Sequence, residues 1–501
     1  MLNSNKFRLL IGSFGLIFLI LSLFMLFVDL RSYKQANLAY PIGSSISGVP
    51  LGGLNHDEAY ERLEFVFTQP VELRYNGARM HLNPVDLGLT LNIDQSLAML
   101  EKETNKSGYW SHLWGKASTS PVEIPLTAET NESILREFLA STILPRYDQP
   151  ATAHAPIIYT TNFEAGVPGF ELDIDSSISL VKAALLSPSS RIVDLPISES
   201  SAKPLDWENL KTFLKQTVLL EGFDGLVEIY INDLQNTNNL HFAYFDNQEV
   251  VPDIAYSAAS TIKIPIMLST FNRLGEPTPE NAQFLMERMI VYSENPPTDD
   301  LMANYIDPVR GPLSVTQDLQ MLGYQNSFLA GFFYVGAPVL ELFKTPANTR
   351  TDVYLDPDVY NQTVPSEIGD LLTQVYYCAN PGLTASKISQ VFQGAVSSNE
   401  CQGMIELLRN NKIGLLIESG LPPQASVAHK HGWTQDLDGT LRTMSDVGIV
   451  TSPGGDYVLV IFMHKPDQLL FSEGNWLFAK LSQTIYNAFN IENQAYWWIE
   501  E

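Results

Sequence analysis

The stretch Ser260-Thr261-Ile262-Lys263 decides the fold of the larger part of this chain. It follows two strand-like runs, 226–234 and 241–247, and it opens an apolar segment that contains Pro265. Proline is tolerated only in the first turn of a helix, so Pro265 predicts a helix that starts within a residue or two of Ser260. In such a helix Lys263 lies one turn after Ser260, on the same face and within reach of its hydroxyl. The pattern predicts a nucleophilic serine with an amine beside it.

Two further short motifs follow in positions that suit a catalytic site. Ser293-Glu294-Asn295 comes after a helical pattern over 280–292, and Pro296-Pro297 ends that helix, so the motif is expected on a rigid turn. Lys430-His431-Gly432 lies in a strand-like run. The glycine there permits a close approach of another group to the backbone. Strand-like runs over 446–451 and 457–463 then predict a three-stranded antiparallel meander, which a final helix over 475–489 covers.

Each motif taken alone is weak, because copies occur elsewhere in the chain. S-x-x-K also occurs at Ser179–Lys182 and at Ser200–Lys203, S-x-N at Ser397–Asn399, and K-x-G at Lys412–Gly414. Lys203 precedes a proline, which prevents Ser200 and Lys203 from sharing a helical face. The Ser179 copy fits a plain amphipathic helix, and Lys412 lies in a run, 404–417, that fits a helix with a frayed end. Only the ordered trio has the expected context at every position.

The ordered trio resembles the class A β-lactamases and related penicillin-binding serine hydrolases over residues 205–501. The resemblance implies an α+β fold, with an antiparallel five-stranded sheet flanked by helices and an all-helical subdomain. It makes Ser260 the nucleophile, Lys263 the base and Ser293 the proton relay. Lys263 can act as a base only if burial and the charge of Lys430 lower its pKa from about 10.4 toward 7.

The same resemblance assigns the substrate-binding residues. Asn295 orients Lys263 and the substrate amide, and Lys430 attracts a substrate carboxylate, with His431 and Gly432 beside it. The backbone N–H groups of Ser260 and Trp433 form the oxyanion hole. Two positions depart from the family pattern. His431 stands where Thr or Ser is usual; it can still donate a hydrogen bond to a carboxylate, but it is larger and can titrate, which argues against classical β-lactam affinity. Glu294 stands where Asp is usual, a mild change.

A third departure concerns release of the acyl group. Class A β-lactamases activate a water with a loop Glu, and no Glu-x-x-Leu-Asn pattern precedes the Thr-x-Pro start at Thr363. Asn348 falls near the expected place, and Asp352, Asp356 or Asp358 can replace the base, although each fits a loop or capping carboxylate as well. The sequence therefore favours a serine acyl-enzyme former with slow turnover over an efficient β-lactamase.

The N-terminal part predicts a membrane anchor and two repeats. Residues 9–28 carry no charge and are long enough to span a bilayer, and we expect an uncleaved anchor over 1–40 rather than a cleaved signal peptide. A strand-like segment over 88–97 returns at 169–178, and each copy ends at an Asp that can cap the next helix. Each copy also has an earlier helix and strand, at 57–67 and 71–75 and at 131–139 and 156–160. Two α+β modules over 41–200 resemble peptidoglycan-binding repeats, and a plain spacer is the alternative.

Composition excludes several classes of function. A net charge of −26 argues against binding to nucleic acid or to anionic lipid headgroups. Cys378 and Cys401 are the only cysteines; they can pair in an oxidising compartment or stay as two buried thiols. No spacing of His or Cys indicates a metal site, and no glycine-rich loop indicates a cofactor, so we expect neither.

These observations predict a single-pass protein of the cell membrane with an extracytoplasmic serine hydrolase domain. The expected substrate is a β-lactam or a peptide derived from peptidoglycan, with cell-wall contact through the repeats and no nucleic acid. A D-Ala-D-Ala carboxypeptidase or another cell-wall amidohydrolase is the first alternative. A cell-wall binding protein with a weakly active or inactive hydrolase fold is the second.

Overall fold

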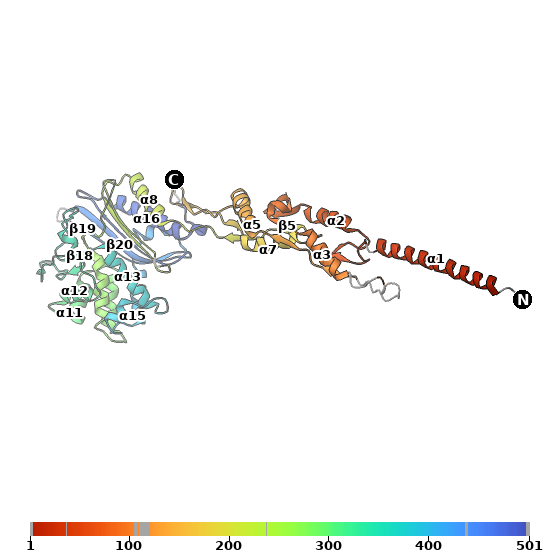
Figure 1. Ribbon diagram of the computed structural model, residues 1–501. Coiled ribbons are helices and arrows are strands. Elements are labelled where there is room, and N and C mark those ends of the chain that lie inside the picture. The colour runs from red at the N-terminus through yellow and green to blue at the C-terminus, as the bar shows by residue number, and fades with distance from the viewer. Residues whose placement is uncertain are drawn as a thin grey trace. The chain divides into compact units, whose positions relative to one another are not determined.

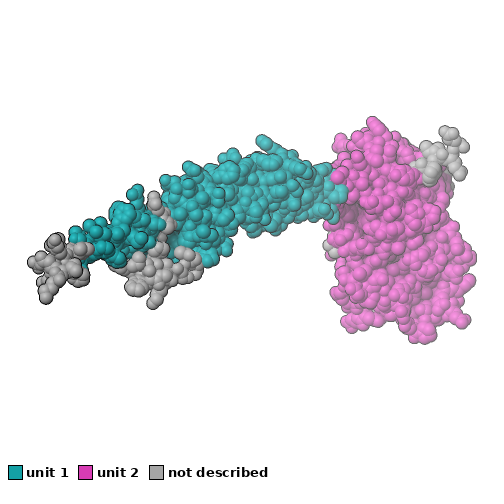
Figure 2. Space-filling model, turned by 90° about the vertical axis from the view of Figure 1, so that its right-hand side faces the viewer, with its two compact units in different colours: residues 1–152, 168–201 teal, residues 153–167, 202–501 magenta. Residues whose placement is uncertain are grey.

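The computed structural model describes residues 4–36, 38–104, 109, 121–236, 238–435 and 439–496. The chain forms two compact units, one of residues 1–152 and 168–201 and the other of residues 153–167 and 202–501 (Figure 2). Residues 153–167, which the sequence analysis placed with the repeats, lie in the C-terminal unit.

The N-terminal unit begins with a long apolar helix, followed by small sheets with helices packed on them (Figure 1). Its elements are α1 (Ser4–Ala36), β1 (Ser45–Ile46), β2 (Val49–Pro50), α2 (His56–Thr68), β3 (Val71–Tyr75), β4 (Ala78–Leu82), β5 (Leu89–Leu91), α3 (Ile93–Thr104), β6 (Glu123–Ile124), β7 (Ala128–Thr130), α5 (Glu132–Phe138), α6 (Leu144–Tyr147), β10 (Gly169–Leu172), α7 (Ile174–Leu185), β11 (Ile192–Asp194) and β12 (Ile197–Ser200). Within α1, Ile11–Lys34 is long and apolar enough to cross a membrane, and a signal sequence meets the same criteria.

The N-terminal unit has two apolar clusters, and one of them contains residues from both repeat copies. Strand β3 of the first copy pairs in parallel with β11, which follows the second copy, and antiparallel with β4. Leu73 on β3 and Val193 on β11 are both buried in one apolar cluster, which also contains Val181 of α7. Asp173 caps α7 by accepting a hydrogen bond from Ser176 N, as a residue with this role should.

The C-terminal unit is built around one antiparallel sheet. Its elements are β8 (Ala155–Pro156), β9 (Phe163–Glu164), α8 (Trp207–Leu220), β13 (Leu226–Asp233), β14 (Asn239–Phe245), β15 (Gln248–Val250), β16 (Tyr256–Ser257), η3 (Ala259–Ile262), α9 (Lys263–Phe271), α10 (Glu280–Ile290), α11 (Pro296–Tyr305), α12 (Gly311–Met321), β17 (Phe328–Leu329), η4 (Ala347–Thr349), β18 (Asn361–Thr363), α13 (Pro365–Ala379), α14 (Lys387–Val391), α15 (Ser398–Arg409), η5 (Glu418–Gly420), β19 (Ser426–Gln435), β20 (Leu441–Thr451), β21 (Tyr457–His464), α16 (Phe471–Phe489) and η6 (Ile491–Asn493). The strand order is β15-β14-β13-β21-β20-β19, so the expected five strands are present and β15 adds a short sixth. The predicted α+β class is confirmed.

Alternation along the central strand explains the layers. On β21, Val460 and Phe462 face one apolar cluster and Leu459 and Ile461 face another, because successive side chains of a strand point to opposite faces. The first cluster includes buried residues of α9, α10, α13 and α15, and the second includes buried residues of α8 and α16. Because β21 is buried on both faces, nearly all of its residues are apolar.

The segment 153–167 is a hairpin that packs on the end of the chain. Phe163 N donates to Gln494 Oε1 at 2.6 Å, and Gln494 Nε2 donates back to Phe163 O at 2.8 Å. Thr161 Oγ1 donates to the buried Gln483 Oε1 at 2.7 Å. The expected strand over 156–160 is wrong: β8 contains only Ala155–Pro156, and Tyr159 has a left-handed φ of 67° in the turn that follows.

Candidate active site

The nucleophile candidate Ser260 lies on a 3₁₀ turn, not in the α-helix that the sequence predicted. The turn is η3, and α9 starts at Lys263, which leaves Pro265 inside the first turn of α9, where its missing N–H does no harm. Ala259, just before the serine, has a φ of 48°, a left-handed conformation that residues with a Cβ seldom adopt. Ser260 itself is half-buried. The strained residue and the tight turn together fix the position of the Ser260 backbone.

Lys263 is fully buried, and its ammonium is held by the second motif. Its Nζ donates to Ser293 O at 2.7 Å and to Asn295 Oδ1 at 2.8 Å. The ring of Phe333 lies 5.5 Å from the same nitrogen. Burial lowers the pKa of Lys263 to about 7, although the charges of Asp299 and Glu294 act in the opposite direction. A lysine in this state is a base near neutral pH.

The second motif forms the turn between α10 and α11, as expected. Ser293 has a φ of 59°, and the two prolines that begin α11 follow Asn295 directly. Glu294, at the middle position, is turned to Arg288, whose Nε donates to it at 2.9 Å. The turn therefore presents a carbonyl and an amide oxygen to Lys263, while its carboxylate is held by an arginine.

The third motif lies on β19, the edge strand of the sheet. Lys430 is fully buried, and its Nζ donates to Ser293 Oγ at 2.9 Å. Burial, together with the charge of Lys263, lowers the pKa of Lys430 to about 7. A Cβ on Gly432 would lie 2.9 Å from Ala258 O and 3.2 Å from Ser260 N, so the missing side chain lets the strand approach the nucleophile. The structure thus brings Ser260, Lys263, Ser293, Asn295, Lys430 and Gly432 together.

His431 and Trp433 occupy the alternate positions of β19. Their rings stack, with centroids 4.6 Å apart. Asn411 Nδ2 lies 3.2 Å from His431 Nδ1. Burial, with the charges of Lys430 and His429, lowers the pKa of His431 to about 2, so this histidine is neutral at physiological pH. The sequence had allowed it to titrate, and the positive surroundings prevent that.

The duplicate motifs lie elsewhere. Ser179 and Lys182 are on α7 in the N-terminal unit, where Lys182 Nζ lies 3.5 Å from Glu132. Ser200 ends β12, so it is on a strand. Lys412 is exposed in the segment after α15.

The loop that precedes β18 holds the residues considered for release of the acyl group. Asn348 is a structural residue: its side chain binds Thr345 N at 2.9 Å and Gln362 Oε1 at 3.0 Å. Asp352 pairs with Arg350, whose Nη2 lies at 2.6 Å, and the arginine holds the pKa of that carboxyl well below its usual range. Asp358 accepts a hydrogen bond from Tyr360 N at 2.9 Å, a contact typical of a turn.

Two residues near Lys263 that the sequence analysis did not name are Phe333 and Asp299. Asp299 lies on α11, one turn after Asn295, and accepts a hydrogen bond from Phe333 N at 2.8 Å. Burial raises the pKa of Asp299. The i to i+4 spacing after the S-x-N motif is the one sequence signal that pointed to Asp299.

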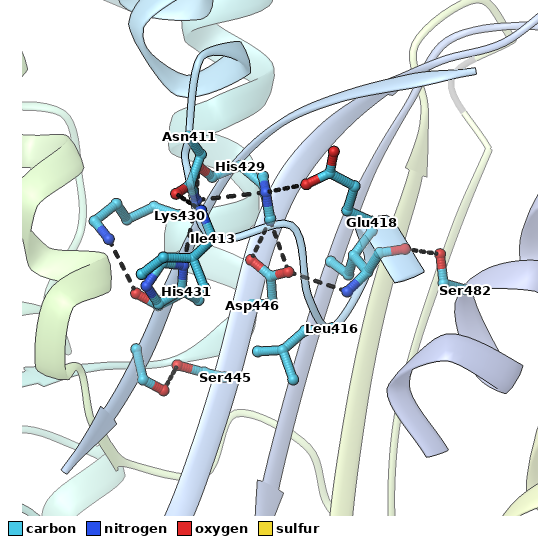
Figure 3. Close-up of polar contacts among 12 residues, drawn as sticks. Asn411, Ile413, Leu416, Glu418, His429, Lys430, His431, Ser445, Asp446 and Ser482 are labelled. Carbon is cyan, nitrogen blue, oxygen red and sulfur yellow. Dashed lines mark hydrogen bonds and ion pairs between the residues drawn. The ribbon is translucent and has the colours of Figure 1, made fainter. Parts of the chain in front are cut away.

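A buried polar cluster lies beside the third motif (Figure 3). His429 Nδ1 lies 2.8 Å from Asp446 Oδ2 on the paired strand β20, and His429 Nε2 lies 3.5 Å from Glu418. Burial alone would lower the pKa of His429, but the two carboxylates raise it to about 9, so His429 is an imidazolium at neutral pH. Asn411 joins this cluster to His431. The sequence indicated no role for His429.

Among the described residues, Glu228, His241 and Asp253 form one group with metal-ligand chemistry. The Glu228 carboxylate is already engaged, with His241 Nε2 at 2.8 Å and Asp253 N at 2.5 Å on one oxygen and Ile254 N at 3.2 Å on the other. These contacts indicate a structural role, in which Glu228 holds the segment that leads to β16.

Residues 280–489 match the model of the beta-lactamase enzyme family, a range that contains Ser293 and Lys430. The match supports a beta-lactamase-like serine hydrolase fold for this part of the chain. The matched range begins after Ser260 and Lys263. Lys263 nevertheless contacts Ser293, which lies inside that range. No curated protein matches the chain.

Several solved structures resemble the beta-lactamase-family unit. PBP-A is 21% identical, with a TM-score of 0.39, over 57% of this chain and 97% of that chain. A class A beta-lactamase from Bacteroides cellulosilyticus DSM 14838 is 17% identical, with a TM-score of 0.39, over 56% of this chain and 97% of that chain. A beta-lactamase from Desulfarculus baarsii DSM 2075 is 15% identical, with a TM-score of 0.40, over 56% and 97%.

Proposed function

We propose that this protein is a membrane-anchored extracytoplasmic serine hydrolase that forms an acyl-enzyme with a β-lactam or a peptide amide. The observation that carries the proposal is the meeting of two buried amines at one residue. Lys263 Nζ contacts the backbone oxygen of Ser293 at 2.7 Å, and Lys430 Nζ contacts its hydroxyl at 2.9 Å. Two buried lysines at one serine cost stability, so we infer that they serve chemistry.

In this mechanism Ser260 Oγ attacks the carbonyl carbon of the substrate and its proton passes to neutral Lys263 Nζ. The oxyanion is stabilised by the N–H groups of Ser260 and Trp433. As the C–N bond breaks, Ser293 Oγ gives its proton to the leaving nitrogen and takes in exchange the proton that Lys263 received, so that Lys263 is neutral again. Lys430 hydrogen-bonds Ser293 Oγ and attracts the substrate carboxylate. The acyl group remains as an ester on Ser260, and a water molecule hydrolyses it in the second half-reaction.

The second half-reaction is proposed to be slow. A general base must lie within hydrogen-bond reach of the attacking water, and Asp299 and Glu294 are the carboxylates whose charges act on Lys263. Glu294 is paired with Arg288, and Asp299 accepts a backbone N–H. The ring of Phe333 also lies beside the ammonium, 5.5 Å from Lys263 Nζ. This arrangement favours a long-lived acyl-enzyme, and with it a cell-wall carboxypeptidase or related amidohydrolase as the second candidate function.

Two features support the proposed location. Ile11–Lys34 supplies the candidate anchor, and Cys378 of α13 forms a disulfide with Cys401 of α15. Disulfides persist mainly in oxidising compartments, which favours the outside of the membrane for the hydrolase unit. Protease protection in right-side-out and inverted membrane vesicles tests the orientation, and digestion of the hydrolase unit only in inverted vesicles would contradict it.

Labelling of the full-length protein with a fluorescent penicillin tests the nucleophile. We expect one label per chain, on the peptide that contains Ser260, and no label in Ser260→Ala. Ser179→Ala is the matched control, because it removes the serine of the other helical S-x-x-K copy and should label like the wild type. Label retained in Ser260→Ala would refute the assignment. Sustained hydrolysis of a chromogenic cephalosporin over many turnovers would instead contradict the slow second step.

A further inference from the structure

Asn411 lies between the two histidines of β19 and is fixed in one orientation. Its Oδ1 accepts a hydrogen bond from Ile413 N at 3.1 Å, so its Nδ2 is the donor that faces the strand. That nitrogen lies 3.2 Å from His431 Nδ1 and 3.4 Å from His429 Nε2. The backbone oxygen of His429 lies 3.4 Å from the same nitrogen and can accept one of its two hydrogens. Of the two imidazole nitrogens, only one is free to accept the other.

His429 is not the acceptor. Its Nδ1 proton goes to Asp446, which is buried, and its Nε2 proton faces Glu418 at 3.5 Å. With a carboxylate at each nitrogen, His429 carries both protons and accepts no hydrogen bond. Asn411 therefore donates to His431 Nδ1.

His431 consequently has its own proton on the other nitrogen. A neutral imidazole that accepts at Nδ1 carries its proton on Nε2. The ring cannot take a second proton, because burial and the positive charges of Lys430 and His429 oppose it. Among the described residues Nε2 has no hydrogen-bond partner, yet it is not sealed from solvent. The ring thus offers one unused N–H donor next to Lys430.

We propose that Asn411 is a positioning residue that fixes His431 in the Nε2–H tautomer, so that the ring donates to the substrate carboxylate where a hydroxyl would otherwise do so. This inference rests on the proposed function, in which Lys430 attracts that carboxylate. The opposite tautomer would present a lone pair to a carboxylate and repel it. Asn411 thereby determines specificity without touching the reacting atoms.

The test compares Asn411→Leu with the wild type, as full-length protein in detergent micelles. The substrates are benzylpenicillin and its methyl ester, which lacks the carboxylate. We expect the acylation rate constant for benzylpenicillin to fall by about tenfold, the usual size of one hydrogen bond to a charged group, while the methyl ester reacts as before. Asn410→Leu is the matched control, because Asn410 is exposed and adjacent, and it should change neither rate.

A double-mutant cycle separates the tautomer from a displaced loop. In a His431→Thr background the threonine hydroxyl donates the hydrogen bond, and a hydroxyl has no tautomers for Asn411 to select. Asn411→Leu should therefore have no further effect in that background. A persistent loss there, or an equal loss for both substrates, would overturn the proposal. The ¹⁵N chemical shifts of the His431 ring, assigned by comparison with His431→Thr, give a readout independent of acylation. If the wild type is not acylated at all, the proposed function fails, and unchanged ring shifts in Asn411→Leu would separately refute the role of Asn411.

Discussion

Lowering the pH should slow acylation of Ser260 because it protonates Lys263. Burial lowers the pKa of this lysine to about 7, so about half of it is neutral at pH 7 and about 1% at pH 5. A lysine with its ordinary pKa would be neutral in only about one molecule in 3,000 at pH 7. If Lys263 is the base, the acylation rate constant should therefore fall by about fifty-fold between pH 7 and pH 5.

The assay must separate Lys263 from Lys430, whose pKa is also lowered to about 7. A fluorophosphonate has no carboxylate, so its reaction should report the base alone and rise with pH to a plateau. A penicillin also needs a protonated Lys430, so its rate should rise and then fall, with a maximum near neutral pH. Single-turnover labelling of the full-length protein measures both profiles.

A flat profile between pH 5 and pH 8 with the fluorophosphonate would refute the role of Lys263. Lys412→Ala is a suitable control, because it removes an exposed lysine from the other K-x-G copy and should leave both profiles unchanged. If Lys412→Ala shifted the fall in rate at acidic pH, that fall would report the overall charge of the protein rather than protonation of the buried amine.

Three predictions concern stability, each measured by denaturant or thermal unfolding of the full-length protein. The pKa of Lys263 is lower in the folded state, so its ammonium opposes folding fully below pH 7, and this cost disappears as the pH rises to about 10.5. Lys263→Met should therefore stabilise the fold by on the order of 4 kcal/mol at pH 7. A destabilised variant would contradict this. Replacing Cys378 and Cys401 by serine should cost about 3 kcal/mol, and an unchanged midpoint under reducing conditions would show that the bridge contributes nothing. Thr161→Val leaves Gln483 Oε1 without its donor and should cost about 1–3 kcal/mol; no loss would mean that the hairpin 153–167 is not anchored there.

The larger elements of the hydrolase unit could be predicted from the sequence because their patterns are local. The strand over 457–463 was found from its apolar run, and β21 spans Tyr457–His464. The turn that carries Ser293 followed from the two prolines after it. At Ser260 the sequence predicted an α-helix, whereas the structure has a 3₁₀ turn before α9. Ala259 in this turn has a left-handed backbone, and no sequence signal indicates that conformation.

Contacts between distant parts of the chain could not be predicted in the same way. The hairpin 153–167 was assigned to the repeats because it precedes the linker, whereas side-chain hydrogen bonds to Gln483 and Gln494 attach it to the other unit. Counting residues placed the missing loop base near Asn348, but the Asn348 side chain binds Gln362, and Phe333 is a residue near Lys263 that the count did not find. No local pattern distinguishes these partners, because each depends on how two remote segments pack.

The charges around β19 explain why a histidine is compatible with the third motif. Lys263 and Lys430 meet at Ser293, and a third positive charge, on His429, lies one residue from Lys430. His429 is stabilised by Asp446 and Glu418 on its own side of the strand. Among the residues that the structure describes, no carboxylate forms an ion pair with either lysine, and the pKa values of both are lowered to about 7. In these surroundings the donor at position 431 should be neutral, because a further positive charge beside these cations is disfavoured. A hydroxyl meets that condition by its nature, and an imidazole meets it here because the neighbouring cations keep a second proton away and Asn411 directs the first one to Nε2.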